Sequence, residues 1–169
     1  MGVPFPANLS RFDPYKIYPF LVYFGDSPTP VAGVSKVGAL TQTSAVVDYN
    51  SGGDAVTRKG LGRTTYADIT LERGVTHDTD FEEWAKSAQS LDHGVPSSSL
   101  KNLRKQLIIV LMNEARQPVI RYIVHRAWVS EFRALPDLDG GNSGIAIESI
   151  KLANEGFERD TTLAMPPEN

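Results

Sequence analysis

Two long apolar runs separated by a short polar segment constrain the fold of this chain more than any other feature. Residues 103–112 and 118–129 are rich in β-branched and aromatic residues, and residues 113–117 have the composition of a hairpin connection. Side chains alternate along the second run: Ile120, Tyr122, Val124, Arg126 and Trp128 form one set, and the other set includes Ile123 and Val129. Both sets therefore contain large apolar groups. We therefore expect two strands, neither face of which is simply exposed to water.

Further strands are predicted on both sides of this hairpin. They are residues 17–24, a strand starting at Val31, residues 64–71 and residues 144–153. Glycine and proline mark the turns between them, notably at residues 25–28 and in the open turn 139–144. Pro19 lies inside the first strand and lacks a backbone donor, which favours an edge position for that strand.

One helix is predicted at about residues 80–91. Thr79 and Glu82 have the spacing of a capping box, in which the hydroxyl and the carboxylate satisfy amides at the helix start. Phe81, Trp84, Ala85 and Ala88 form an apolar stripe that can lie on a sheet. We expect Phe81 and Trp84, together with Trp128, to be core residues.

The whole chain is predicted to be one domain of the mainly β, β-rich α+β class. At 169 residues it is long enough to bury an ordinary hydrophobic core. An irregular N-terminal arm over residues 1–16 and a C-terminal tail over residues 160–169 extend from that domain. Residues 50–63 contain four glycines, which predicts a long loop or a protruding hairpin.

Composition excludes several classes of protein. The absence of cysteine excludes disulfides and thiolate metal sites, and a net charge of −3 gives no overall attraction to nucleic acid. The longest apolar run, residues 107–112, is too short to span a bilayer, so we expect no membrane insertion. The first twenty residues do not have the pattern of a secretory signal.

No catalytic, cofactor or metal site is predicted. His77 and His93 are sixteen positions apart at opposite ends of the predicted helix, so the helix cannot bring them to one metal ion. The sequence has no Gly-x-Ser-x-Gly elbow, and Lys59-Gly60 is not the Gly-Lys-Ser/Thr of a phosphate-binding loop. His125 is expected to be a packed or interface residue. The prediction is that the chain is not an enzyme; a monomeric β-barrel that binds or hydrolyses a small ligand is the rival from another class.

Several segments, taken in chain order, resemble the tail-tube family of contractile phages and extracellular contractile injection systems. The longest is residues 66–84, YADITLERGVTHDTDFEEW. The others are 13–16 (DPYK), 31–37 (VAGVSKV), 128–139 (WVSEFRALPDLD) and 147–159 (IESIKLANEGFER). They are distributed along the chain between residues 13 and 159.

This resemblance implies a two-sheet, β-barrel-like tail-tube fold with one packed helix, assembled as a hexameric ring with a continuous inner β-barrel. Stacked rings would form a rigid conduit that sheath contraction propels to deliver DNA or protein cargo. The implied partners are other copies of the chain, the sheath, and baseplate and tail-terminating proteins. Assembly would take place in the bacterial cytoplasm, before the subunit becomes part of a phage tail or an injection particle. A baseplate tube-initiating or capping protein of the same fold is the alternative.

Contacts between rings are expected from the glycine-rich segment and the termini. In this hypothesis Arg58, Lys59 and Arg63 pair with Asp137 and Asp139 of another subunit. The alternative is a solvated loop. The charge of the lumen depends on strand register, because a shift of one residue exchanges the two faces of a strand.

Overall fold

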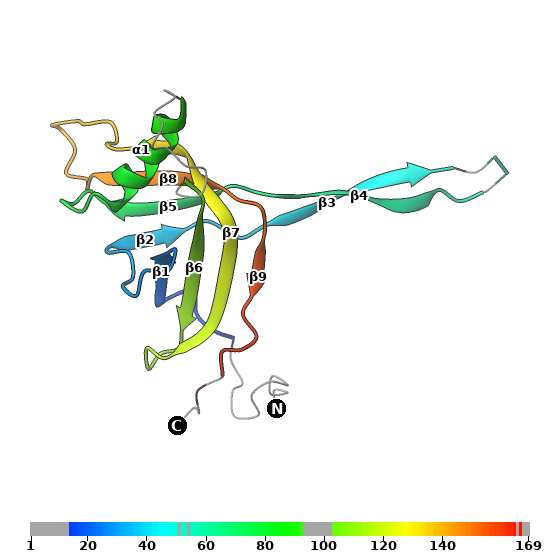
Figure 1. The fold of residues 1–169 in the computed structure, drawn as a ribbon, viewed down its shortest axis with the longest axis horizontal. Coiled ribbons are helices and arrows are strands. Elements are labelled where there is room, and N and C mark those ends of the chain that lie inside the picture. The colour runs from blue at the N-terminus through cyan, green and yellow to red at the C-terminus, as the bar shows by residue number, and fades with distance from the viewer. Residues whose placement is uncertain (1–13, 51, 54, 93–102, 165, 167–169) are drawn as a thin grey trace.

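The computed structural model describes residues 14–50, 52–53, 55–92, 103–164 and 166 (Figure 1). Most of the predicted N-terminal arm, part of the predicted C-terminal tail and His93 lie outside these residues. The elements in chain order are β1 (Phe20–Phe24), β2 (Val34–Val37), β3 (Gln42–Tyr49), β4 (Arg58–Tyr66), β5 (Ile69–Gly74), α1 (Asp80–Asp92), β6 (Lys105–Met112), β7 (Pro118–Arg133), β8 (Ile147–Ala153) and β9 (Phe157–Arg159).

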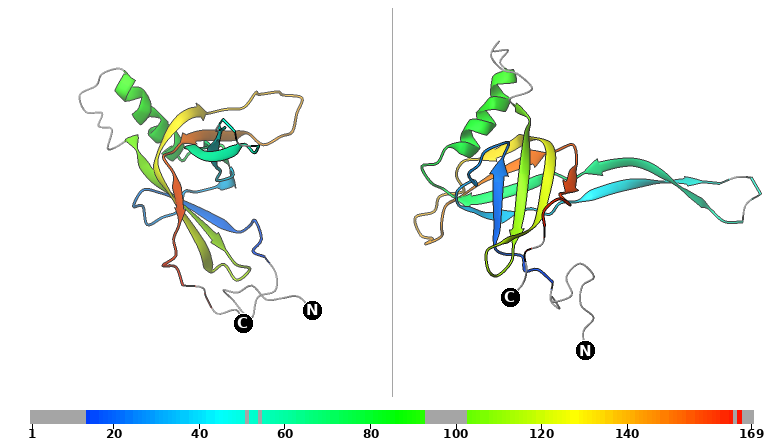
Figure 2. Two further views of the ribbon diagram at one scale, coloured as in Figure 1. Left: turned by 90° about the vertical axis from the view of Figure 1, so that its right-hand side faces the viewer. Right: turned by 60° about the horizontal axis from the view of Figure 1, so that its bottom comes forward.

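Two layers of antiparallel strands form the body of the molecule. The strand order of the main sheet is β1-β6-β7-β8-β5-β2, with β9 also paired to β7. Strand β7 belongs to both layers: its first part pairs with β6 and β9, and its second part pairs with β8. In Figure 2 the right-hand view shows β1, β6 and β7 side by side in front of the other layer. The fold is mainly β with two sheets, as the sequence predicted.

The core lies between the two layers and is closed by α1. Val22, Leu107 and Val124 come from one layer, and Leu71 and Ile150 from the other. On the helix, Phe81 and Trp84 are fully buried. Their rings lie 6.0 and 4.6 Å from the Phe24 ring, and the Trp84 Nε1 donates a 2.9 Å hydrogen bond to the Leu103 carbonyl. The apolar stripe of the helix thus packs over the end of β1.

Trp128 is the core prediction that the structure does not follow. Lys105 pairs with Ala127 and Leu107 with Val124, so β7 contains one residue more than β6 between these pairs. Arg126 adopts a φ of 51° at this bulge. The extra residue reverses the alternation of side chains, so that Ala127 and Val129 are buried while Trp128 is only half-buried.

The helix begins as predicted, but with different capping bonds. Thr79 precedes the helix and its carbonyl accepts a hydrogen bond from the Glu83 amide. The Asp78 carboxylate accepts from the Asp80 amide at 2.9 Å, and the Thr79 hydroxyl donates to the Glu83 carboxylate at 2.8 Å. Glu82 instead pairs with Lys86 at 2.7 Å. A carboxylate is the stronger partner for the helix amides, so Asp78 takes part of the role expected of Thr79 and Glu82.

The segment 50–63 is the tip and part of one strand of a protruding hairpin. Residues 58–63 belong to β4, which pairs with β3. The predicted strand 64–71 is in fact the end of β4 and the start of β5, separated by residues 67–68. The predicted strand 118–129 extends to Arg133, and β3 and β9 were not predicted.

Candidate assembly surfaces

The β3–β4 hairpin, here called the arm, projects far beyond the two-layered body (Figure 1). In the described part of the chain no other strand pairs with it. Five large apolar side chains on it are 54–84% exposed: Val46, Val47, Tyr49, Val56 and Leu61. A two-stranded hairpin is marginally stable alone in water, and exposed apolar side chains on it favour a covering partner. The arm is therefore a candidate surface for assembly.

The root of the arm is fastened to the body near β9. The Tyr66 ring lies 5.7 Å from the Phe157 ring, which lies 6.4 Å from the Tyr122 ring, both edge-to-face. Asn154 Nδ2 donates a 2.9 Å hydrogen bond to the Ala67 carbonyl. A Cβ at Gly156 would lie 3.2 Å from the Tyr66 ring. These contacts fix the direction in which the arm leaves the body.

Gly62→Ala is expected to disrupt the arm, because a Cβ there would lie 2.9 Å from the Ala45 carbonyl oxygen and 3.0 Å from its Cβ. Hydrogen exchange should show at least about ten-fold faster exchange of arm amides, while the body keeps its protection. The matched control is Gly60→Ala, whose nearest contact would be 3.5 Å. Equal protection of the arm in the two variants would contradict the steric argument.

The charged residues proposed for ring contacts lie at opposite ends of the subunit. Arg58, Lys59 and Arg63 are exposed on β4 of the arm. Asp137 and Asp139 are exposed in the loop 134–146, which lies at the other end of the longest axis (Figure 1). One subunit therefore does not bring these groups together, and only a second copy could do so.

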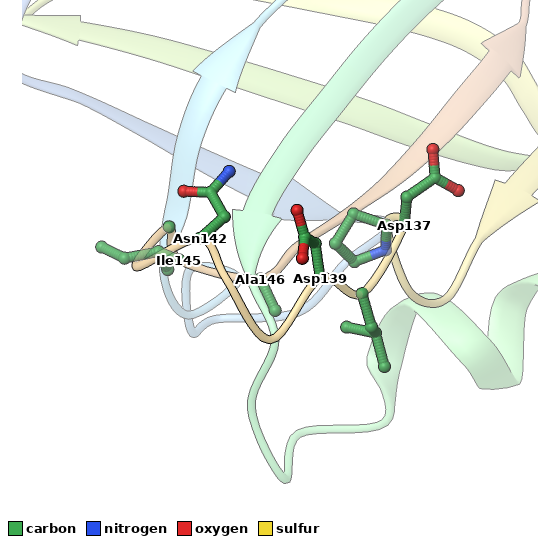
Figure 3. A pocket seen from close by; sticks show the side chains of 8 residues that line it. Asp137, Asp139, Asn142, Ile145 and Ala146 are labelled. Atoms are coloured by element: carbon green, nitrogen blue, oxygen red, sulfur yellow. The ribbon is translucent and has the colours of Figure 1, made fainter.

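The loop 134–146 also contains a cavity of about 290 Å³ (Figure 3). Its lining includes Asp137, Leu138, Asp139 and Ile145, and the two apolar side chains are 75% and 83% exposed. Asp139 Oδ1 accepts a 2.9 Å hydrogen bond from the Gly141 amide, which orders the turn. The loop thus combines acidic and apolar groups, as the arm combines basic and apolar groups.

Ion pairs fasten β9 and its neighbours to β7. His125 Nε2 lies 3.1 Å from Glu158 Oε1, and Arg121 Nη1 lies 3.2 Å from Asp160 Oδ2. Hydrogen bonds from the hydroxyl and amide of Thr162, together with Arg121, lower the pKa of Asp160 below its ordinary value. His125 thus contacts a carboxylate of the neighbouring strand β9 on the face of the sheet. The root contacts and β9 were missed because β9 is only three residues long.

The described residues contain neither a metal-binding cluster nor a helix that could cross a membrane. No three His, Cys, Asp or Glu side chains there gather so that they could hold a metal ion. No helix in that part of the chain is long and apolar enough to cross a membrane.

Comparison with known proteins identifies the family of residues 17–158. They match the model of the family described as "T4-like virus tail tube protein gp19". A chain from the anti-feeding prophage cap (AFP tube terminating cap) has a TM-score of 0.72 at 22% identity, covering 91% of this chain and 95% of that one. A chain from an extracellular contractile injection system, the PVC sheath-tube complex in its extended state, has a TM-score of 0.71 at 23% identity, with coverage of 87% and 91%. At these identities the structures show a shared fold. No curated protein sequence matches the chain.

Proposed function

Because the chain belongs to the T4-like virus tail tube protein gp19 family, we propose that it is a structural subunit whose hexameric rings stack into the inner tube of a contractile particle. The arm is the observation that carries this proposal. It extends from the body with exposed apolar side chains that a neighbouring subunit would cover. Arm and loop 134–146 are different surfaces at opposite ends, so contact between them is heterologous and propagates along an assembly.

In this proposal the arm of one ring contacts the loop 134–146 of the next. Arg58, Lys59 and Arg63 pair with Asp137 and Asp139, and the apolar groups of arm and loop cover one another. Opposite charges fix register and partner choice, while burial of apolar area supplies most of the affinity.

The tube is a conduit for DNA or protein cargo, surrounded by a contractile sheath whose contraction drives it forward. Its other partners are baseplate and tail-terminating proteins. The subunit assembles in the bacterial cytoplasm and then becomes part of a phage tail or an injection particle. A tube-initiating or capping protein of the same fold would form rings that do not elongate.

Negative-stain electron microscopy of the purified chain at increasing concentration tests this function. We expect six-fold rings and hollow tubes that lengthen with concentration. Rings that never elongate would favour the capping role. A chain that remains monomeric even with preformed tube ends to add to would overturn the proposal.

Arg63→Glu is expected to weaken stacking, because it places a carboxylate against Asp137 or Asp139 of the next ring. The concentration at which tubes appear should rise about ten-fold, which corresponds to about 1.4 kcal/mol per contact. Sedimentation of tubes at low salt measures this concentration, and high salt should reduce the difference.

The matched control is Lys36→Glu, which reverses an exposed charge paired with Glu72 on the body. It should leave tube formation nearly unchanged. A single exchange of charge, Asp137→Arg or Asp139→Arg added to Arg63→Glu, should recover part of the assembly, because the other aspartate stays available to Arg58 and Lys59. Stacking that is unaffected by Arg63→Glu would refute the proposed pairing.

A further inference from the structure

Asp139 in the loop 134–146 (Figure 3) is followed by Gly140, and this is the one Asp-Gly pair in the sequence. Both residues are exposed and lie outside every helix and strand. A Cβ built at Gly140 would meet no atom within 4 Å. Among the described residues, none accepts a hydrogen bond from the Gly140 amide. The backbone nitrogen next to the Asp139 carboxyl group is therefore neither shielded by a side chain nor held by a partner.

Two other aspartates share the local hydrogen bond of Asp139 but differ in the residue that follows. The carboxylates of Asp78, Asp139 and Asp160 each accept a 2.9 Å hydrogen bond from the backbone amide two positions further along the chain. Asp78 and Asp160 also pair with arginines, at 3.3 and 3.2 Å. Each of these two precedes a threonine, whose branched Cβ crowds the backbone. Of the three, Asp139 alone combines this turn with a following glycine.

We propose that Asp139 is a modification site, at which the aspartate converts spontaneously to isoaspartate. The Gly140 nitrogen attacks Cγ of the protonated carboxyl group: an N–Cγ bond forms, the Cγ–OH bond breaks, and the hydroxyl leaves as water with the amide proton. Water then adds to the main-chain carbonyl of the resulting five-membered succinimide and breaks that carbonyl's bond to nitrogen. The backbone now runs through Cβ and Cγ. One water is lost and one is gained, so the mass is unchanged and the reaction needs neither oxidant nor reductant.

The conversion changes the surface that stacking uses, a consequence that rests on the proposed function. Isoaspartate lengthens the backbone of the loop by one carbon and moves the carboxylate onto Cα. Asp139 lines the cavity of the loop together with Asp137, Leu138 and Ile145, so both the shape and the charge of this surface change. A neighbouring arm that covers the loop also restricts the backbone motion that ring closure requires. Unassembled subunits therefore lose the capacity to stack as they age, whereas stacked subunits keep it.

The site is tested by keeping the unassembled subunit in warm, near-neutral buffer for several weeks and mapping its peptides. Trypsin releases residues 134–151 as one peptide, because no lysine or arginine lies between Arg133 and Lys151. Chromatography separates the two peptides of equal mass, and electron-transfer fragmentation identifies the residue with the altered backbone. Deamidation of Asn142 is distinguished because it raises the mass. We expect at least about ten-fold more isoaspartate at Asp139 than at Asp78 or Asp160.

Gly140→Ala is the matched variant, because the loop has room for the added methyl group. It should lower the conversion of Asp139 at least about ten-fold, since the methyl group crowds the attacking nitrogen and restricts the backbone. The unmodified chain in urea is the positive control and should form isoaspartate at Asp139. Conversion in urea without conversion in the folded subunit would overturn the proposal. Equal conversion in Gly140→Ala would also overturn it, because the succinimide route depends on the glycine.

The effect on stacking is tested by sedimenting tubes from aged subunits and by ageing tubes that are already formed. Sedimented tubes should contain several-fold less isoaspartate than the subunits left in solution, and preformed tubes should convert several-fold more slowly than free subunits. Equal isoaspartate in tubes and free subunits would overturn the predicted effect on stacking. A chain that forms no rings or tubes would instead count against the tube function, while the mapping of the unassembled subunit would still decide whether Asp139 is a modification site.

Discussion

Replacing Arg73 by methionine is expected to lower the free energy of unfolding by about 3–5 kcal/mol. The Arg73 side chain is fully buried on β5, where its Nε contacts the Glu148 carboxylate. Its Nη2 donates a 2.7 Å hydrogen bond to the Asp78 carbonyl, and its Nη1 lies 3.3 Å from the Asp78 carboxylate. The guanidinium also lies 4.2 Å from the centre of the Phe81 ring. Removing the cation leaves Glu148, which is 7% exposed, without its partner.

Urea unfolding of the unassembled subunit measures this loss, and Lys36→Met is its matched control. Lys36 pairs with Glu72 at 3.1 Å, but its side chain is 66% exposed. An exposed pair of this kind contributes about 0–1 kcal/mol. Adding Glu148→Leu to Arg73→Met should recover part of the stability, because no buried carboxylate then remains unpaired. A cost for Arg73→Met as small as that of Lys36→Met would show that the buried pair has no special role.

The predicted strand 64–71 ended before Arg73, so the sequence analysis showed neither its place on β5 nor its role. Ile69, Leu71 and Arg73 alternate along β5 and share the core face. Alternation alone predicts that an arginine at such a position marks the end of the buried stretch. Its burial depends on Glu148, which is brought opposite it by the pairing of β5 with β8, and on Asp78 before the helix. Partners that meet only through strand pairing leave no periodic signal in the sequence.

The arm shows where composition is informative and where it is not. Glycines and basic residues in segment 50–63 predicted a protruding element, because that composition cannot form a packed core. The predicted boundary between the protruding segment and the next strand was wrong, because residues 58–63 already belong to β4. A hairpin outside the core needs no regular alternation of apolar and polar side chains, so the sequence did not mark where the strand begins. Likewise, the separation of the arm from the loop 134–146 follows from the three-dimensional arrangement (Figure 1) and has no trace in local sequence.

The bulge in β7 is the reason why the prediction of Trp128 as a core residue was wrong. A strict alternation from Val124 would place Trp128 with it on the core face. One extra residue, with Arg126 in the left-handed region, moves Trp128 to the other side. No glycine or proline marks this position in the sequence, so the bulge could not be recognised there. The two tryptophans therefore differ in burial although both lie within apolar runs.

Trp84→Ala is expected to cost about 3–5 kcal/mol of folding free energy, as large aromatic-to-alanine changes in cores do. Trp84 is 1% exposed, and its ring packs 4.6 Å from the Phe24 ring at an interplanar angle of 60°. Its removal also deprives the Leu103 carbonyl of a 2.9 Å hydrogen bond. Urea unfolding of the unassembled subunit, followed by circular dichroism, measures the loss. Trp84→Phe should recover much of the packing but leave the carbonyl unsatisfied, at about 1–3 kcal/mol.

Trp128→Ala is the control that separates burial from residue type, and we expect it to cost about 1–2 kcal/mol because Trp128 is only half-buried. The chain has two tryptophans, so each alanine variant retains a single tryptophan, which is excited selectively above the absorption of tyrosine. Emission from Trp84 alone should be blue-shifted and poorly quenched by iodide, whereas emission from Trp128 alone should be red-shifted and quenched. Equal stability losses and equal quenching in the two variants would mean that β7 has no bulge at Arg126 and that both side chains share the core face.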